Sequence, residues 1–170
     1  GSIASQSRIS NALIKFADQG GTVIGICNGF QILTELKLLP GTLVRNKNLK
    51  FICKDINLKV NKNSRFTNLY NNNEVIRIPI AHAEGNYFTD KKTLKKLKDN
   101  DQIIFSYCNE NGDITKESNP NGSLLNIAGI TNKKGNVIGL MPHPERVSEK
   151  VFNNTDGIKF FKSVVNYHNY

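Results

Sequence analysis

Residues 22–36 have the sequence TVIGICNGFQILTEL, which is the strongest indication of the fold class. Thr22–Ile26 is a short β-branched run without polar alternation, which is typical of a central strand of a parallel sheet covered on both faces. The chain then turns at Cys27, and apolar residues from Phe30 to Leu36 recur at helical spacing. A buried strand that leads directly into a helix predicts an α/β fold, with a cysteine at the junction.

Outside this stretch, the periodicity predicts further helices and strands. Helices are expected over about 5–18, over the lysine-rich segment KKTLKKLKD at 91–99, and from about 155 onwards. Strands are expected near 51–60, 74–81 and 102–108, and two more at 126–131 and 136–141 are expected to form a hairpin. A chain of 170 residues has room for one domain, which we expect to span residues 1–170.

Composition argues against several classes of protein. The formal net charge is +9, but the lysines are scattered among asparagines and no nucleic-acid-binding motif accompanies them, so nucleic acid is not an expected partner. No apolar run is long enough to span a membrane, and the first residues lack a secretory signal, so we expect a cytoplasmic protein. Three cysteines without paired spacing argue against a disulfide framework and against a metal site.

Cys27 lies in the sequence GICNG, which has the glycine spacing of a nucleophile elbow. At such a turn, the positive end of the following helix favours the thiolate, and the backbone N–H of Asn28 can point at a developing oxyanion. Both features would assist acyl transfer. A buried structural cysteine between two glycines is the competing interpretation, so a base has to be found. Cys53 and Cys108 lie within strand-like runs and are predicted to be small core residues.

His143 is the candidate base. It follows a predicted strand, and the flanking prolines favour an extended backbone rather than a helix. In an extended chain, residues two apart point the same way, so Glu145 is expected to lie beside the imidazole and hold its useful tautomer. A histidine in a proline-rich turn beside a surface glutamate is the alternative. The elbow cysteine favours the catalytic interpretation.

Four segments carry a resemblance to a known family: GICNGFQILTELKLLPG, IPIAHAEGNYF, NPNGSLLNIAGI and GNVIGLMPHPER. In these segments the chain resembles the glutaminase subunits of phosphoribosylformylglycinamidine synthase, which are class I glutamine amidotransferases of purine biosynthesis. The first and last segments are shared across that superfamily, whereas the two middle segments are more specific. The resemblance implies a flavodoxin-like, mostly parallel central sheet flanked by helices, with added antiparallel strands.

The resemblance also implies roles for particular residues. Cys27 would be the nucleophile, and His143 and Glu145 would complete the triad. The substrate L-glutamine would be bound by Asn28 through its backbone and by Gln31. Two further residues, His82 and Glu84, would border the glutamine pocket.

The family further implies partners for the chain. Ammonia would pass to a large ATP-binding synthetase subunit, with a small accessory subunit also possible, and ATP and Mg²⁺ would bind to the synthetase rather than to this chain. Two alternatives stay open. The chain could be a non-catalytic binding or scaffolding fragment of that complex, or an amidotransferase of another pathway, such as guanylate or carbamoyl phosphate synthesis.

Two departures from the family pattern have structural consequences. The family usually has glycine at the position of Ala83, so the pocket loop would be altered if that position requires a positive φ. The only methionine is Met141, and the family has βα units and a glycine-rich oxyanion loop before the point where this sequence begins. We therefore expect an N-terminally truncated chain that is poorly stable or incompletely active by itself.

Overall fold

A computed structural model describes residues 8–168. The strands are β1 (Val23–Ile26), β2 (Thr42–Val44), β3 (Ile52–Val60), β4 (Val75–His82), β5 (Asn86–Phe88), β6 (Ile103–Cys108), β7 (Ile127–Thr131) and β8 (Val137–Leu140). The α-helices are α2 (Arg8–Asp18), α3 (Asn28–Glu35), α4 (Lys91–Asp99) and α5 (Ile158–His168). Three 3-10 turns follow later strands: η1 (Leu124–Asn126), η2 (Pro144–Val147) and η3 (Lys150–Phe152).

Most of the predicted elements are present. The junction of β1 and α3, the β7–β8 hairpin and the helix over the lysine-rich segment lie where the sequence predicts them. Helix α4 begins where predicted because the Asp90 carboxylate accepts hydrogen bonds from the backbone N–H groups of Lys92 and Thr93. The expected start of the first helix, at residues 5–7, lies outside the described residues. The short strands β2 and β5 were not predicted.

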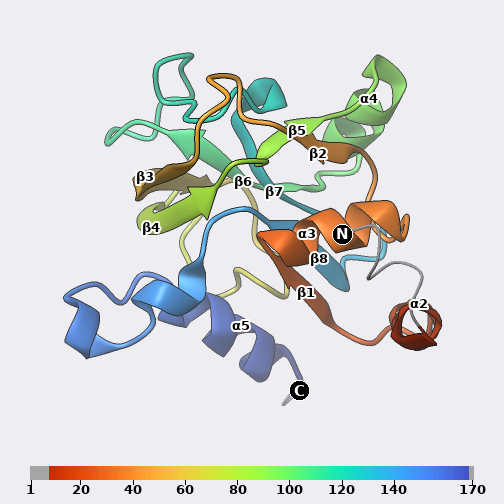
Figure 1. Ribbon diagram of the computed structural model, residues 1–170. Coiled ribbons are helices and arrows are strands. Elements are labelled where there is room, and N and C mark those ends of the chain that lie inside the picture. The colour runs from red at the N-terminus through yellow and green to blue at the C-terminus, as the bar shows by residue number, and fades with distance from the viewer. Residues whose placement is uncertain (1–7, 169–170) are drawn as a thin grey trace.

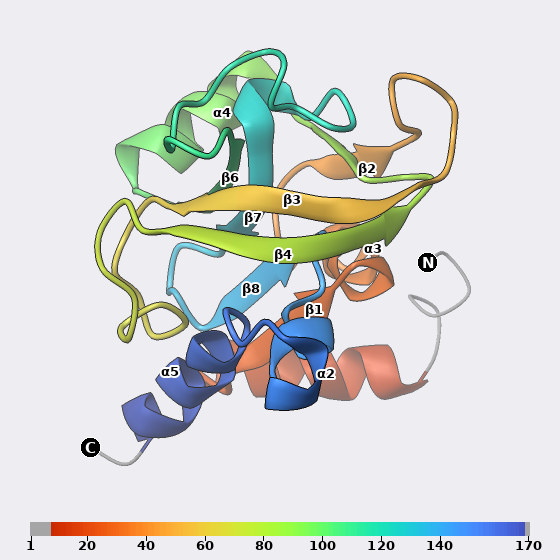
Figure 2. The same ribbon diagram turned by 90° about the vertical axis from the view of Figure 1, so that its left-hand side faces the viewer.

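Six strands form one curled sheet in the order β1-β8-β7-β6-β3-β4, and β2 pairs with β5 in a separate ribbon (Figures 1 and 2). Within residues 8–168, only β1 and β8 pair in parallel, and every other pairing in this sheet is antiparallel. The predicted mostly parallel sheet is therefore wrong for this part of the chain. Consecutive strands such as β3 and β4, or β7 and β8, run back beside each other and are antiparallel, whereas β1 and β8 are joined by a long crossover.

Strand β1 was predicted to be central, but it lies at the end of the described sheet. Its sequence is apolar not because the strand is central but because both of its faces are covered. Val23 packs in a cluster with Phe30 and Leu33 of α3, whereas Ile24 and Ile26 pack in a second cluster with Phe160 of α5. Figure 1 shows α3 and α5 on opposite sides of β1 and β8. The two helices therefore hold the carboxyl end of β1, where Cys27 lies, between two cores.

No helix within residues 8–168 has both the length and the apolar character needed to cross a membrane.

Candidate active site

Cys27 occupies a sharp turn between β1 and α3. Its backbone has φ 52° and ψ −106°, a conformation that is costly for a residue with a side chain. Hydrogen bonds hold the turn on both sides: the Cys27 N–H donates to the Leu140 carbonyl at 2.8 Å, and the Phe30 N–H donates to the Cys27 carbonyl at 3.0 Å. The surrounding structure thus fixes the strained conformation that a nucleophile elbow requires.

Gly25 makes this turn possible. A Cβ at this position would lie 2.5 Å from Leu33 Cδ1 and 2.7 Å from the carbonyl carbon of Gly29. The first turn of α3 therefore packs directly on the backbone of β1. At Gly29, the other glycine of the motif, a Cβ would have no described atom within 4 Å. Gly25 is therefore required by close packing, whereas packing does not require a glycine at position 29.

The Cys27 thiol is half-buried, and burial raises its pKa. The backbone N–H of Asn28 and the charge of Arg146 act in the opposite direction, and Glu145 adds to the rise. The helix terminus was predicted to favour the thiolate, and the Asn28 N–H acts in that direction, but burial has the larger effect on the pKa. The sulfur lies 3.7 Å from the Ala81 carbonyl oxygen, which places it beside the end of β4.

His143 and Glu145 are in contact, as predicted. The distance between His143 Nδ1 and Glu145 Oε1 is 2.6 Å, and the imidazole is buried. The predicted extended backbone is wrong, however, because Pro144–Val147 forms a 3-10 turn with His143 as its N-cap. Proline fits the first position of such a turn without losing a hydrogen bond. The carboxylate contacts Nδ1 and thus leaves Nε2, the other ring nitrogen, without a hydrogen-bond partner among the described residues.

Hydrogen bonds fasten the His143 segment to β4 and to the start of α5. The His143 N–H donates to the Pro79 carbonyl at 2.8 Å, and the Gly157 N–H donates to the Val147 carbonyl at 2.9 Å. A Cβ on Gly157 would lie 2.0 Å from the Pro144 carbonyl oxygen, so the chain can approach this closely only at a glycine. The position of the histidine thus depends on both neighbouring elements.

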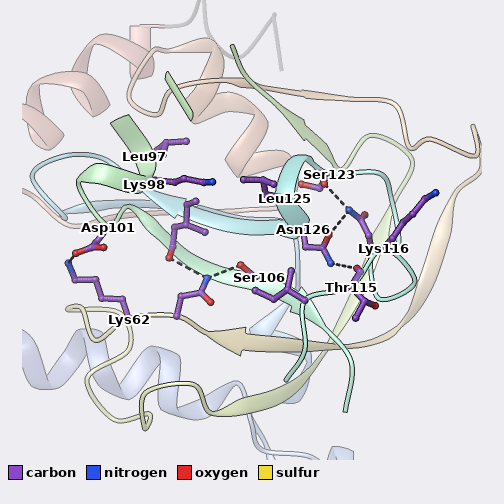
Figure 3. Close-up of a pocket in the computed structure, with 14 residues that line it drawn as sticks. Lys62, Leu97, Lys98, Asp101, Ser106, Thr115, Lys116, Ser123, Leu125 and Asn126 are labelled. Carbon is purple, nitrogen blue, oxygen red and sulfur yellow. Dashed lines mark hydrogen bonds and ion pairs between the residues drawn. The ribbon is translucent and has the colours of Figure 1, made fainter. Parts of the chain in front are cut away.

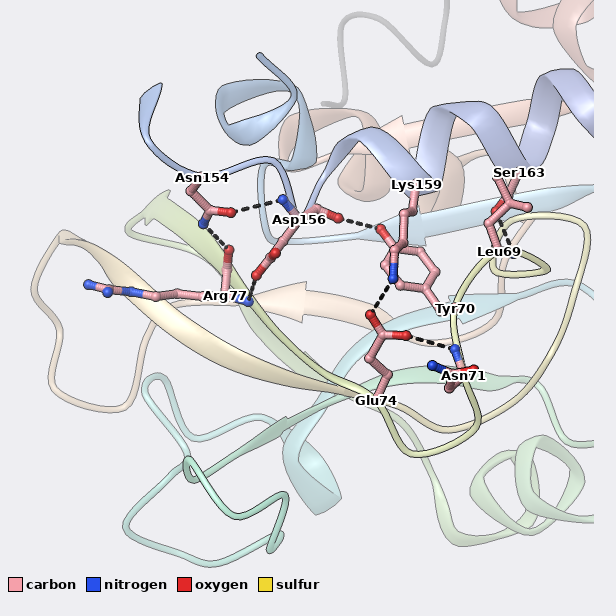
Figure 4. A network of polar contacts seen from close by, with 9 residues as sticks. All are labelled: Leu69, Tyr70, Asn71, Glu74, Arg77, Asn154, Asp156, Lys159 and Ser163. Atoms are coloured by element: carbon pink, nitrogen blue, oxygen red, sulfur yellow. Dashed lines mark hydrogen bonds and ion pairs between the residues drawn. The ribbon is translucent and has the colours of Figure 1, made fainter. Parts of the chain in front are cut away.

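A polar network continues this connection between β4 and α5 (Figure 4). The Asp156 carboxylate accepts a 2.8 Å hydrogen bond from the Arg77 N–H, and its carbonyl accepts one of 2.7 Å from the Tyr70 hydroxyl. Lys159 Nζ lies 2.7 Å from Glu74 Oε1. Burial alone would raise the pKa of Glu74, but hydrogen bonds from Lys159 and from the backbone lower it.

His82 ends β4 and is buried near the triad. Burial, followed by the nearby charge of His143, lowers the pKa of His82 to about 4, so its imidazole is neutral at pH 7. Its Nδ1 lies 3.0 Å from Asn46 Oδ1. Among the described residues, the buried Nε2 atoms of both His82 and His143 have no hydrogen-bond partner.

Gln31 and Glu84 meet through the backbone of the pocket loop. Gln31 Nε2 donates to the Glu84 carbonyl at 2.9 Å. The Glu84 carboxylate is exposed and lies 3.8 Å from Arg45 Nε. The substitution at Ala83 does not distort this loop, because Ala83 is not among the residues with positive φ, and its carbonyl accepts a hydrogen bond from the Asn46 N–H. Gln31 and Glu84, which were both predicted to border the substrate, are therefore in contact, through the Glu84 backbone rather than its carboxylate.

Sequence reasoning assigned no role to Asn46 and Asn121, which connect the loops of the site. Asn121 is buried, and its Nδ2 donates to the Gly85 carbonyl at 2.7 Å and to the Tyr107 hydroxyl at 3.2 Å. Its carbonyl accepts a 2.9 Å hydrogen bond from the Lys47 N–H. Asn121 lies in the NPNGS segment, which resembles the family specifically, but the resemblance does not indicate what this asparagine contacts.

The other two cysteines differ in their surroundings. Cys108 is buried in β6, as predicted, and burial raises its pKa to about 11. Cys53 is exposed, so the prediction that it belongs to the core is wrong. It lies in the first half of β3, where most side chains face solvent. Within the part of the chain that the structure describes, no group of three or more histidine, cysteine or acidic residues could hold a metal ion.

A pocket of about 650 Å³ lies apart from the triad and shares no lining residue with it (Figure 3). Lys62, Lys98 and Lys116 are among its lining residues, and Lys62 is paired with Asp101 at 3.2 Å. The amide of Asn126, at one wall, donates to the Thr115 carbonyl at 2.7 Å. Because the Lys62–Asp101 pair and the Asn126 amide are already engaged with protein groups, we assign no chemistry to this pocket and place the site at Cys27.

Comparison with known proteins identifies the family to which the chain belongs. Residues 1–168 match the family model of the CobB/CobQ-like glutamine amidotransferase domain. The chain is 54% identical over 166 residues to phosphoribosylformylglycinamidine synthase subunit PurQ of Koribacter versatilis, covering 97% of this chain and 72% of the relative. It is 50% identical over 166 residues to the PurQ subunit of Aquifex aeolicus, covering 97% and 73%. The solved structure of PurLQS from Thermotoga maritima superposes with a TM-score of 0.84 at 41% identity, over 98% of this chain and 71% of that chain. The chain therefore belongs to the PurQ family of glutamine amidotransferases.

Proposed function

We propose that Cys27, His143 and Glu145 carry out the glutaminase reaction of this PurQ-family chain. The observation that carries the proposal is the 2.6 Å contact of the buried His143 with the Glu145 carboxylate, together with the contacts of both His143 and the strained Cys27 to the last residues of β4. A cysteine, a histidine and an orienting carboxylate form the arrangement that activates a thiol for acyl transfer.

Burial raises the pKa of the Cys27 thiol, so on this proposal the thiol needs a base that takes its proton. His143 Nε2 takes the thiol proton as the sulfur attacks the side-chain amide carbon of glutamine, and the Asn28 N–H stabilises the oxyanion. The C–N bond then breaks, and the amide nitrogen takes the proton from His143 and leaves as ammonia. His143 next removes a proton from water, which hydrolyses the γ-glutamyl thioester and releases glutamate. Gln31, together with the loop that contains His82 and Glu84, borders the bound glutamine.

The ammonia goes to a synthetase subunit that converts formylglycinamide ribonucleotide to formylglycinamidine ribonucleotide. Two observations support this destination: the identity to PurQ subunits of that synthase and the solved relative whose name joins PurQ with PurL and PurS. On this proposal the partners are a large ATP-binding subunit and a small accessory subunit. ATP and Mg²⁺ bind to the large subunit, and this chain uses no cofactor of its own.

Labelling with 6-diazo-5-oxo-norleucine, an electrophile that mimics glutamine, tests the proposal. Mass spectrometry of the full-length subunit in its complex should find the label on Cys27, and Cys27→Ala should abolish it. Cys53→Ala is the matched control, because Cys53 is the exposed thiol, and labelling should be unchanged. Glu145→Gln should lower the glutaminase kcat by roughly 10²–10⁴. Label on another residue, or equal labelling of Cys27→Ala, would contradict the assignment.

A further inference from the structure

His82 is the polar group next to the triad whose role the proposed reaction leaves undefined. Its side chain is only 4% exposed, and Nε2 has no hydrogen-bond partner within residues 8–168. The preceding residue, Ala81, has its carbonyl oxygen 3.7 Å from the Cys27 sulfur, and His143 is close enough to affect the pKa of His82. A buried nitrogen without a partner is costly, and such an atom beside reacting groups indicates a ligand that completes it.

Asn46 determines which hydrogen-bonding role this nitrogen has. Asn46 is fully buried, and its Nδ2 donates to the carbonyls of Lys50 and His82, each at 2.8 Å. Because only the NH₂ group can donate to two carbonyls, the amide orientation is fixed and Oδ1 must be an acceptor. Oδ1 accepts from the Gly85 N–H at 3.1 Å and contacts His82 Nδ1 at 3.0 Å. Nδ1 must therefore carry the proton.

The neutral ring then presents a bare lone pair at Nε2 and acts there only as an acceptor. The pKa of about 4 is consistent with this state at physiological pH. Packing also prevents the ring from turning away, because a Cβ on Gly85 would lie 2.3 Å from His82 Cε1. Asn121 in turn donates to the Gly85 carbonyl, so the loop against the ring is held from its other side. The ligand that completes Nε2 must therefore be a hydrogen-bond donor.

We infer that His82 Nε2 accepts a hydrogen bond from the amide NH₂ of glutamine, and from ammonia as it leaves, and that Asn46 is the positioning residue that fixes this acceptor. The inference rests on the glutaminase activity proposed above. In the first half of that reaction, the amide nitrogen is the atom of the scissile bond that carries hydrogens from the substrate to the released ammonia. His82 neither gains nor loses a proton, since His143 supplies the one that the leaving nitrogen needs.

An acceptor at this position also gives specificity. An ester oxygen or the carboxylate of glutamate presents lone pairs to the His82 lone pair, which is repulsive, whereas an amide presents N–H groups. The active site would thus favour glutamine over glutamate, the product, and over γ-glutamyl esters of the same size.

The test compares two substrates in the complete enzyme complex: glutamine, and glutamate γ-methyl ester, whose leaving group has no N–H. His82→Asn keeps a polar group near Asn46 but removes the acceptor at Nε2. We expect kcat/KM for glutamine to fall about tenfold more than kcat/KM for the ester. His82→Gln places an amide oxygen near the position of Nε2 and should recover part of the preference for glutamine. Asn46→Ala should lower the preference a few-fold.

Equal losses for both substrates in His82→Asn and in Asn46→Ala would show that the two residues only support the fold, and would overturn the inference. An unchanged preference for glutamine in every variant would also overturn it. Cys27→Ala separates this inference from the proposed function: it should abolish turnover of both substrates. If wild type hydrolyses neither substrate, or Cys27→Ala hydrolyses both, the glutaminase assignment fails first.

Discussion

Replacing Gly25 with alanine should destabilise the elbow, whereas the same change at Gly29 should not. A Cβ at Gly25 would lie 2.5 Å from Leu33 Cδ1 and 2.7 Å from the Gly29 carbonyl carbon and oxygen. The leucine side chain could move aside, but the Gly29 backbone can yield only if the start of α3 shifts. Overpacking of this kind typically costs about 1–3 kcal/mol, and we expect about 3 kcal/mol here because backbone is involved.

The neighbouring strand offers α3 little room to shift. Gly139 of β8 is paired with Gly25, and a Cβ there would lie 2.1 Å from Phe30 Cδ2, so α3 is in close contact with both strands. A shift of the helix would move the Asn28 N–H and the Cys27 thiol together. We therefore expect Gly25→Ala to slow labelling of Cys27 by the glutamine-mimicking electrophile at least tenfold.

Gly29→Ala is the matched control, since no described atom lies within 4 Å of the position that its Cβ would take. Alanine is the better helix former by about 1 kcal/mol, so this variant should be as stable as wild type or more stable. Urea unfolding gives the free energy of unfolding of both variants. Equal losses at Gly25 and Gly29, or a Gly25→Ala variant with wild-type stability and labelling, would refute the argument from close packing.

Three further predictions concern charged and titrating groups. Arg146→Gln should raise the pKa of the Cys27 thiol further and slow its alkylation by iodoacetamide at pH 7 a few-fold, because the positive charge of Arg146 favours the thiolate. The free energy of unfolding should fall by roughly 2–3 kcal/mol as pH decreases from 6.5 to 4, because unfolded His82 binds a proton in that window and folded His82, with a pKa of about 4, does not. His82→Gln should remove this part of the pH dependence, and an identical slope in the variant would contradict it. Removing the partly buried pair with Lys159→Met should cost about 1 kcal/mol in urea unfolding, whereas removing the exposed ion pair of α4 should cost less than about 0.5 kcal/mol.

Local patterns were sufficient to predict the elements around the site. The β1–Cys27 junction, the hairpin before His143 and the helix capped by Asp90 each depend on neighbours in sequence, and each is confirmed. The order of strands in the sheet could not be predicted from such local patterns. An apolar run fits a central strand and equally a terminal strand covered by two helices, and only the fold distinguishes them.

The site itself was predicted in part. The contact of His143 with Glu145 is confirmed, but through a 3-10 turn, because a proline at the first helical position fits such a turn as well as it fits extended chain. The role of Asn46 could not be predicted, since its partner His82 lies 36 residues away and the contact depends on the pairing of distant loops. The exposure of Cys53 likewise depends on which face of β3 is covered.

The pairing of β1 with β8 has a consequence for the order in which the protein folds during synthesis. Gly25 and Gly139 are register partners, so 114 residues separate two adjacent positions of the sheet. A ribosome delivers residues at about 5–20 per second, so β1 waits for several seconds before its described partner exists. The antiparallel strands between them meet earlier, since their partners are closer in sequence. Cys27 therefore acquires its strained geometry only when the last strand of the sheet has been made, and an incomplete chain carries the nucleophile without the means to use it.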